Sequence, residues 1–293
     1  MDAHRINSGR AFPFLSRYPA GLIARLPPGL IVDVGAATGD KTVLMRKANP
    51  ACRVIAYEPF PGNLPYLDRA AGGDAMVAIR PAAVSDYRGT GTLFLPSIIA
   101  GRDRHWAAMA GASRVGKLDA FPLRRFAAKV GVPVVTLDDE IGEHVRFLKI
   151  DVQRGEFHVL NGARAVIERH GVDLIYAEFR GDVRLLRLLD RLGYVFFDAV
   201  YMAWPHRRNP RNWFRAKADW RIPDWDVLDS FALSTGHRAR HVWPRVPSRA
   251  FLPYCAWFQF ERLFVTGLQT DLLCVHQGFL DEFRRLTEAR GQP

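Results

Sequence analysis

Two glycines and one acid follow apolar stretches early in the chain. Gly35 and Gly39 come directly after the apolar run 30–34, and Glu58 follows a second apolar run, 54–57. Glycine lets a ligand approach the backbone closely, and a carboxylate at the carboxyl end of a parallel strand can accept hydrogen bonds from two ribose hydroxyls. This spacing predicts a nucleoside-binding site.

The spacing of the glycines bears on the kind of nucleoside. Dinucleotide folds favour Gly-x-Gly-x-x-Gly, which suits a pyrophosphate at a helix N-terminus, whereas this chain has Gly-x-x-x-Gly. S-adenosylmethionine (SAM) carries no phosphate, and its ammonium group needs a carboxylate or carbonyl partner, which Asp33 could supply. The pattern favours SAM; a dinucleotide and a glycine turn without a ligand remain alternatives.

Polar residues also follow a third apolar run. Ser85 and Asp86 come shortly after the run 76–80, within reach of the same sheet edge. Either side chain could hydrogen-bond the edge of an adenine. The alternative is a Ser-Asp turn that only opens the strand 91–95.

Two further acids end later apolar runs. Asp151 follows 145–150 and Glu178 follows 174–177, so the two carboxylates come close if these strands are adjacent. Such a pair could act as a base, share a proton, bind a divalent cation or hold an ammonium group. We expect base or substrate positioning without a metal, with Glu156 as a third catalytic candidate. His158 is expected on a helix surface, where a histidine is more often structural.

Alternating apolar runs and helical patterns must position these residues. Seven strands are expected, at 30–34, 53–57, 76–80, 145–150, 174–179, 194–197 and 271–275. Helices are expected between them, at 39–48, 62–70, 155–167 and 183–192. Such alternation is typical of an α/β fold whose parallel strands end at one edge. Residues 96–131 carry no chemistry that we can interpret, and we expect a flap.

The length and composition suit one large domain. The 293 residues are 48% hydrophobic. We expect an irregular lead-in over 1–29 and one domain over 30–293, with an insertion of about 202–262 before the last strand. This insertion combines tryptophans with a cluster of basic residues, which suits sugar rings, nucleobases or phosphates. The candidate substrate contacts there are Trp204, His206 and Arg207, although the tryptophans could instead form a small core.

Charge and cysteine content limit the classes of partner and site. The net charge of +11 would attract polyanions, unless the excess is spread widely over the surface. Three cysteines without metal-type spacing indicate neither a disulfide framework nor a zinc site. No apolar run approaches the roughly 18 residues that span a bilayer, so we expect a cytoplasmic protein. Contact with a membrane surface and the oligomeric state are left open.

Taken together, these stretches resemble the FkbM family of SAM-dependent methyltransferases. The matching motifs are D-V-G-A-A-T-G-D (33–40), Y-E-P-F-P-G-N (57–63), A-A-V-S-D (82–86), T-L-D-D (136–139), F-L-K-I-D-V (147–152), V-L-N-G-A (159–163) and A-E-F (177–179). The resemblance implies a class I, Rossmann-like fold: a seven-stranded, mostly parallel sheet with helices on both faces and an antiparallel last strand. It also implies O-methylation of a hydroxyl, often on a sugar or secondary metabolite.

The resemblance further implies roles for individual residues. Asp33, Gly35 and Gly39 would line the methionine part of SAM, and Glu58 would bind the ribose. Ser85 or Asp86 would contact the adenine, and Asp151 would face the reacting centre. The predicted cofactor site also includes the neighbours Ala36 and Pro59.

The chain departs from the family pattern at 153–155. The family usually continues D-V-E-G-A-E, whereas this chain has Asp151-Val-Gln153-Arg154-Gly155-Glu156. Because an acid and a glycine are replaced while Asp151 and Glu156 remain, we expect an active site with altered substrate contacts. The resemblance and the basic, tryptophan-rich insertion indicate a small-molecule or glycan acceptor that could be anionic. No base-methylation motif follows the fourth strand and no RNA-binding module is recognisable, so we expect no nucleic-acid partner. The alternatives are a non-catalytic protein that binds a polyanion and a nucleic-acid methyltransferase.

Overall fold

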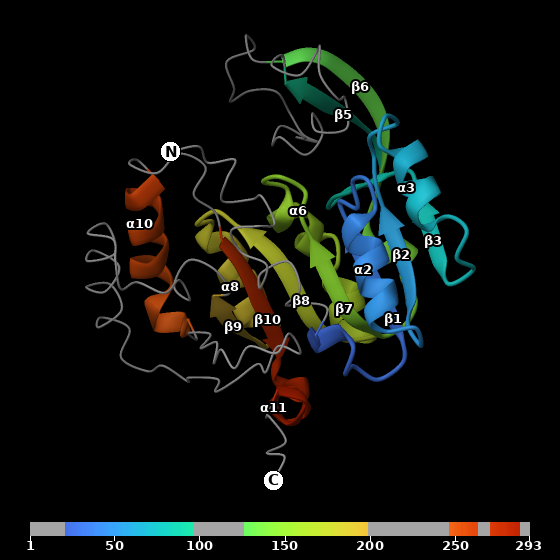
Figure 1. The fold of residues 1–293 in the computed structure, drawn as a ribbon. Helices are drawn as coiled ribbons and strands as arrows, with labels where there is room; N and C mark the ends of the chain where they lie inside the picture. The colour runs from blue at the N-terminus through green and yellow to red at the C-terminus, as the bar shows by residue number, and fades with distance from the viewer. Residues whose placement is uncertain (1–20, 97–125, 199–245, 263–269, 288–293) are drawn as a thin grey trace, which may run out of the picture. The chain divides into compact units, whose positions relative to one another are not determined.

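The computed structural model describes residues 21–96, 126–198, 246–262 and 270–287 (Figure 1). The chain divides into two compact units. The first is Pro27–Val172, and the second is Asp173–Pro293 together with Met1–Leu26.

The described part of the first unit is built on four parallel strands. β1 (Leu30–Val34) pairs with β2 (Arg53–Tyr57) and with β7 (Val145–Ile150), and β3 (Val77–Arg80) pairs with β2. All residues of β1 are buried, as a central parallel strand requires. Its helices are α2 (Asp40–Ala48), α3 (Leu64–Ala71), α5 (Leu137–Glu140), α6 (Glu156–Asn161) and α7 (Arg164–Arg169).

A small sheet extends from the same unit. Its strands β4 (Ala83–Val84), β6 (Phe126–Val135) and β5 (Gly89–Pro96) lie in that order, with β5 and β6 antiparallel. We call β5 and β6 the arm (Figure 1). The strand expected at 91–95 is confirmed, but residues 126–131 of the expected flap belong to β6. A glycine and a proline within β6 conceal its strand pattern.

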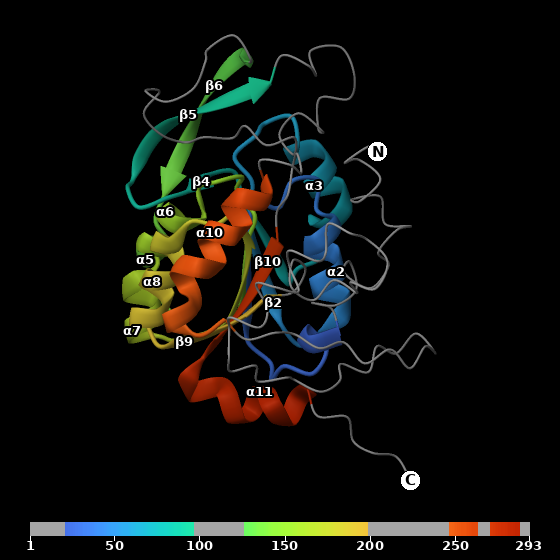
Figure 2. The same ribbon diagram turned by 90° about the vertical axis from the view of Figure 1, so that its left-hand side faces the viewer.

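Three strands lie in the described part of the second unit. β10 (Thr270–His276) lies between β8 (Val172–Phe179) and β9 (Tyr194–Asp198) and is antiparallel to both. The helices are α8 (Val183–Arg191), α10 (Phe251–Arg262) and α11 (Leu280–Thr287), with 3-10 turns at Ser248–Ala250 and Gln277–Phe279. In Figure 2, α10 runs beside α8.

The seven long strands follow the order β3-β2-β1-β7-β8-β10-β9, and only β10 is antiparallel to the others. This confirms the predicted α/β fold with a mostly parallel sheet and an antiparallel last strand. The single helix expected over 155–167 is wrong, because α6 ends before Gly162 and α7 begins at Arg164. Gly162 packs so tightly that a Cβ atom there would lie 2.1 Å from the carbonyl oxygen of Ser85. Most of the lead-in and residues 202–245 of the insertion lie outside the described residues.

Candidate functional site

Three candidate residues leave neighbouring strands of the first unit at the same level. In the parallel register, Val34 of β1 is opposite both Tyr57 of β2 and Ile150 of β7. The next residues along the three strands are Gly35, Glu58 and Asp151. The carboxyl ends of β1, β2 and β7 therefore bring together a glycine and two carboxylate-bearing residues, at the edge where open α/β sheets bind ligands (Figure 1).

The turn after β1 depends on glycine. Gly35 has φ 82°, and a Cβ atom there would lie 2.1 Å from the carbonyl oxygen of Asp151. Gly39 has φ 92° and precedes α2, and its Cβ would lie 2.9 Å from Leu67. Both conformations are in the left-handed region that disfavours other residues. The backbone N–H groups of Gly35 and Ala36 donate to the Tyr57 carbonyl at 3.0 Å, which fixes the turn against β2.

Glu58 is buried at the end of β2 and is held by three donors. One oxygen, Oε2, accepts from the Ala37 N–H at 2.8 Å. The other, Oε1, accepts from the Phe60 N–H at 2.9 Å and from Asn63 Nδ2 at 3.2 Å. Burial raises the pKa of Glu58, and these hydrogen bonds oppose the rise only in part. A carboxylate has about four acceptor positions, so Glu58 retains capacity for a further donor.

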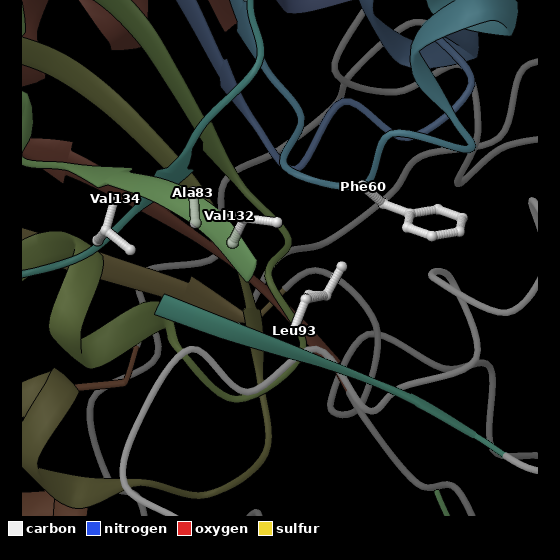
Figure 3. Close-up of a cluster of buried hydrophobic side chains, with 5 residues drawn as sticks. All are labelled: Phe60, Ala83, Leu93, Val132 and Val134. Atoms are coloured by element: carbon white, nitrogen blue, oxygen red, sulfur yellow. The ribbon is translucent and has the colours of Figure 1, made fainter. Parts of the chain in front are cut away.

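The loop that carries Glu58 is anchored to the small sheet by Phe60, two residues beyond it. Phe60 belongs to a buried cluster with Ala83 of β4, Leu93 of β5, and Val132 and Val134 of β6 (Figure 3). Pro59, between Glu58 and Phe60, is partly buried. The position of Glu58 thus depends on packing against the arm as well as on β2.

Asp33 lies beneath the glycine turn rather than at its surface. Its side chain is fully buried, with Oδ2 accepting from Thr42 Oγ1 at 2.7 Å and Oδ1 accepting from Lys149 Nζ at 2.9 Å. Lys149 also donates to the carbonyl oxygen of Gly35 at 2.9 Å. Both oxygens of Asp33 therefore support the turn, and a direct contact with an ammonium group stays a prediction.

Lys149 is a functional candidate that the sequence reasoning missed. It is the register partner of Asp33 on β7. Burial alone would lower the pKa of Lys149, but the charges of Asp33 and Asp151 outweigh burial and raise it, so the lysine is charged. The available signal was a lysine between Leu148 and Ile150, two residues typical of a buried strand, since a buried charge requires a partner.

Asp151 begins the loop from 151 to 155 that follows β7. Its N–H donates to the Val34 carbonyl at 3.0 Å, and its Oδ1 accepts from Gln153 Nε2 at 3.0 Å. Among the described residues, Oδ2 of Asp151 has no hydrogen-bond partner. Gln153 and Arg154 have φ values of 59° and 85°. Such a conformation costs about 1–3 kcal/mol for a residue other than glycine.

Glu156 begins α6 and is buried. Its Oε1 accepts from the backbone N–H of Arg154 at 3.0 Å. This bond holds the end of the 151–155 loop in its left-handed conformation. A catalytic role for Glu156 stays a prediction, and the contact gives the side chain a positioning role.

Asp86 is bound by residues of α6. Oδ2 of Asp86 accepts from His158 Nδ1 at 2.9 Å and from Asn161 Nδ2 at 3.3 Å. The hydroxyl of the buried Ser85 lies 3.4 Å from Oδ1. Partial burial alone would raise the pKa of Asp86, but His158 and Asn161 outweigh it and lower the pKa.

The T-L-D-D motif serves helix ends. Thr136 Oγ1 accepts from the Asp139 N–H at 3.1 Å, which caps α5. Asp138 does not cap its own helix but accepts from the N–H of Val166 in α7 at 2.8 Å. The motif therefore joins α5 to α7.

In the second unit, Glu178 lies near the end of β8, is buried, and forms an ion pair with Arg180. Its approach to Asp151 stays a prediction. The expected substrate contacts Trp204, His206 and Arg207 lie outside the described residues.

The described residues hold neither a metal-binding cluster nor a membrane-spanning helix. They include no group of three or more His, Cys, Asp and Glu side chains arranged to hold a metal ion. Within the same ranges, no helix combines the length and apolar character required to cross a membrane.

Comparisons with known proteins bear on this arrangement. No curated protein matches the chain. Among solved structures, a methyltransferase FkbM from Methylobacillus flagellatus KT is 18% identical with a TM-score of 0.37, and the match covers 61% of this chain but only 39% of that one. StiE O-MT is 10% identical with a TM-score of 0.35, over 97% of this chain and 78% of the other. The plantazolicin methyltransferase BpumL in complex with SAH is 9% identical with a TM-score of 0.32, over 94% and 89%.

The family comparison covers the candidate site itself. The family model described as the methyltransferase FkbM domain matches residues 33–196. This range includes the glycine turn, Glu58, the 82–86 motif and Asp151, and it makes up more than half of the chain. The protein therefore belongs to the FkbM methyltransferase domain family.

Proposed function

We propose that the protein is a SAM-dependent O-methyltransferase that acts on a hydroxyl group of a sugar, glycan or secondary metabolite. The observation that carries the proposal is the family match over the stretch in which Gly35, Glu58 and Asp151 leave three parallel strands at one level. The restriction to O-methylation rests on the sequence resemblance.

The residues at this edge fit the chemistry of SAM. Glu58 accepts hydrogen bonds from the ribose hydroxyls, for which its remaining acceptor capacity is suited. A buried acceptor, Oδ1 of Asn63, has no hydrogen-bond partner among the described residues and lies on the side chain that contacts Glu58. The charges of Asp151 and Glu58 favour a ligand with ammonium and sulfonium groups. The charge of Lys149 is compensated by Asp33, so it offers little to a pyrophosphate.

When bound, SAM supplies an electrophilic methyl group on a sulfonium sulfur. The protein must hold the acceptor hydroxyl in line with that methyl group, because positioning can supply most of the rate enhancement. Asp151 takes the hydroxyl proton as the new bond forms, through Oδ2, while Gln153 orients the carboxylate through Oδ1. A positioned base contributes roughly 10²–10⁴-fold.

The proposed acceptor contacts beyond this unit are Trp204, His206, Arg207 and Glu178. Aromatic faces and guanidinium groups suit a small molecule or glycan with anionic character. We propose that this part of the chain selects the acceptor, and that the first unit binds the cofactor.

Calorimetry and turnover test the proposal together. We expect S-adenosylhomocysteine (SAH) to bind the wild-type protein, and Glu58→Ala to abolish that binding. Asp151→Asn should lower turnover of a hydroxylated acceptor by about 10²–10⁴-fold with little change in SAH affinity. Wild-type turnover in Asp151→Asn would remove Asp151 from the mechanism.

A non-catalytic protein that binds polyanions is the second candidate, favoured by the substituted 153–154 positions and the net charge of +11. The same calorimetry separates the two candidates. Absence of SAH binding, with tight binding of heparin that weakens steeply as salt is raised, would establish the second candidate and overturn the first.

A further inference from the structure

The two oxygens of the Asp86 carboxylate have different partners, because both hydrogen bonds from α6 reach the same oxygen. Oδ2 receives both His158 Nδ1 and Asn161 Nδ2, at 2.9 Å and 3.3 Å. Because an ionised carboxylate only accepts hydrogen bonds, Nδ1 of His158 must carry the hydrogen. Oδ1 faces the Ser85 hydroxyl at 3.4 Å, which is long for an O–H···O bond of about 2.5–3.0 Å, and the backbone N–H of Asp86 itself also interacts with the carboxylate. Because both donors of α6 bind Oδ2, Oδ1 has the greater remaining capacity to accept a further hydrogen bond.

The helix is built to make this contact. His158, Asn161 and Gly162 are spaced i, i+3 and i+4, so they share one face of α6 and its end. Gly162 brings the backbone of α6 against Ser85, where a Cβ atom would lie 2.1 Å from the Ser85 carbonyl oxygen. The packing of Gly162 against Ser85 thus places the segment of α6 that carries both donors beside Asp86.

The contact contributes little to folding. The side chains of His158 and Asp86 are 48% and 26% exposed. Ion pairs exposed to this extent contribute about 0–1 kcal/mol to stability. Stabilisation of the fold therefore does not account for two donors that bind one oxygen. Variants at His158 should fold.

We propose that His158 and Asn161 are positioning residues for base recognition: they hold Asp86 through Oδ2 so that Oδ1 accepts a hydrogen bond from the exocyclic amino group of adenine. This inference rests on the proposed function. An acceptor-only carboxylate fixed in this way favours a 6-amino purine, which donates, over a 6-oxo purine, which presents another acceptor. His158 and Asn161 thereby set the preference of the site for adenine.

The test compares SAH with S-inosylhomocysteine, in which an oxo group replaces the 6-amino group of the purine and N1 carries a hydrogen. Calorimetry on the full chain gives both dissociation constants. We expect the wild-type protein to prefer SAH by about 100-fold, since a site that hydrogen-bonds a ligand group rejects analogues lacking it. His158→Ala should weaken SAH binding about tenfold and reduce the preference to about tenfold or less, because Asp86 can then rotate.

Three further variants make the result specific. His158→Asn retains a donor near the position of Nδ1 and should restore most of the preference. Asp86→Asn should reduce the preference most strongly, because an amide can turn either its oxygen or its nitrogen toward the base. His170→Ala is the matched control, since His170 is an exposed histidine of the same unit that is not a partner of Asp86.

Two results would overturn the inference in different ways. If the wild-type protein prefers SAH and His158→Ala retains that preference in full, the positioning role is wrong while the proposed function stands. If the wild-type protein binds neither ligand, the proposed function fails together with the inference. Unfolding curves of His158→Ala that match wild type within about 1 kcal/mol confirm that either result reports on the site.

Discussion

The two sides of the glycine turn differ in how completely their polar groups are satisfied. Beneath the turn, Asp33 is fully buried and both of its oxygens are bound, by Thr42 and Lys149. Beside the turn, Asp151 is partly exposed, has one oxygen bound by Gln153, and precedes a backbone in the left-handed region. The arrangement around Asp33 stabilises the fold. The arrangement around Asp151 leaves one carboxylate oxygen to accept a hydrogen bond and holds the following backbone in an unfavourable conformation, which is typical of sites that contact a substrate.

The largest expected effect comes from removing the charge beneath the turn. Lys149→Met leaves Asp33 buried without its ionic partner, so the free energy of unfolding should fall by about 3–5 kcal/mol in urea denaturation. The double variant Asp33→Asn with Lys149→Met should lose less than the two single variants combined. Arg53→Met removes an exposed ion pair with Glu143 and should cost less than about 1 kcal/mol. Equal losses for Lys149→Met and Arg53→Met would contradict the comparison.

A side chain at the turn itself should be nearly as damaging. Gly35→Ala combines φ 82° with a Cβ atom 2.1 Å from the Asp151 carbonyl oxygen. We expect a loss of about 2–5 kcal/mol in thermal or urea unfolding. Gly142→Ala is the control, because nothing lies within 4 Å of a Cβ atom there. It should change stability by less than about 1 kcal/mol, and a similar loss at both positions would refute the steric explanation.

Glu58 is expected to give two opposite pH trends. Its folded pKa is raised above the ordinary 4.5, so the folded protein binds this proton more tightly than the unfolded chain does. The contribution of Glu58 to stability therefore falls as pH rises through the raised pKa. SAH affinity should instead fall as pH decreases toward that pKa, by up to about tenfold per pH unit below it, because ribose hydroxyls need an ionised acceptor.

Calorimetry and unfolding curves measured over the same pH range check both trends. Glu58→Gln has no titrating carboxyl group, so both trends should be absent from it. An SAH affinity that falls with pH equally in the wild type and in Glu58→Gln would assign the dependence to another group.

The smallest expected effect is an increase in stability, whereas the substitutions at Lys149 and Gly35 should decrease it. Arg154→Gly places glycine at φ 85°, and we expect a gain of up to about 1 kcal/mol, since relief of the conformational cost exceeds the added freedom of the unfolded chain. Arg154→Ala keeps the β-carbon and should show no such gain. A stability loss in Arg154→Gly would mean that the 151–155 loop is held by the arginine side chain. A stable Arg154→Gly protein that loses turnover but binds SAH would assign Arg154 to the acceptor.

Most of the sheet could be predicted from the sequence because each long strand is an apolar run ended by a polar residue or a turn. The expected strand at 30–34 is observed over its full length, for example. Features set by contacts between distant segments were missed. The break between α6 and α7 depends on the approach of Gly162 to Ser85, and the pairing of Lys149 with Asp33 joins positions 116 residues apart.

The same limit applies to the candidate site. The motifs located Gly35, Glu58, Asp86 and Asp151, because each residue ends a recognisable run. They did not indicate which partners would occupy the oxygens of each carboxylate. That information requires the register of β1, β2 and β7 and the orientation of α6.

The packing of Phe60 has a consequence for building chimeras. Since Phe60 shares its buried cluster with Leu93, Val132 and Val134 of the arm, the arm cannot be exchanged between family members as an independent module. A grafted arm whose inner residues leave a void under Phe60 would loosen the loop that carries Glu58. Exchanging the arm alone would therefore weaken nucleoside binding unless Phe60 is exchanged along with it.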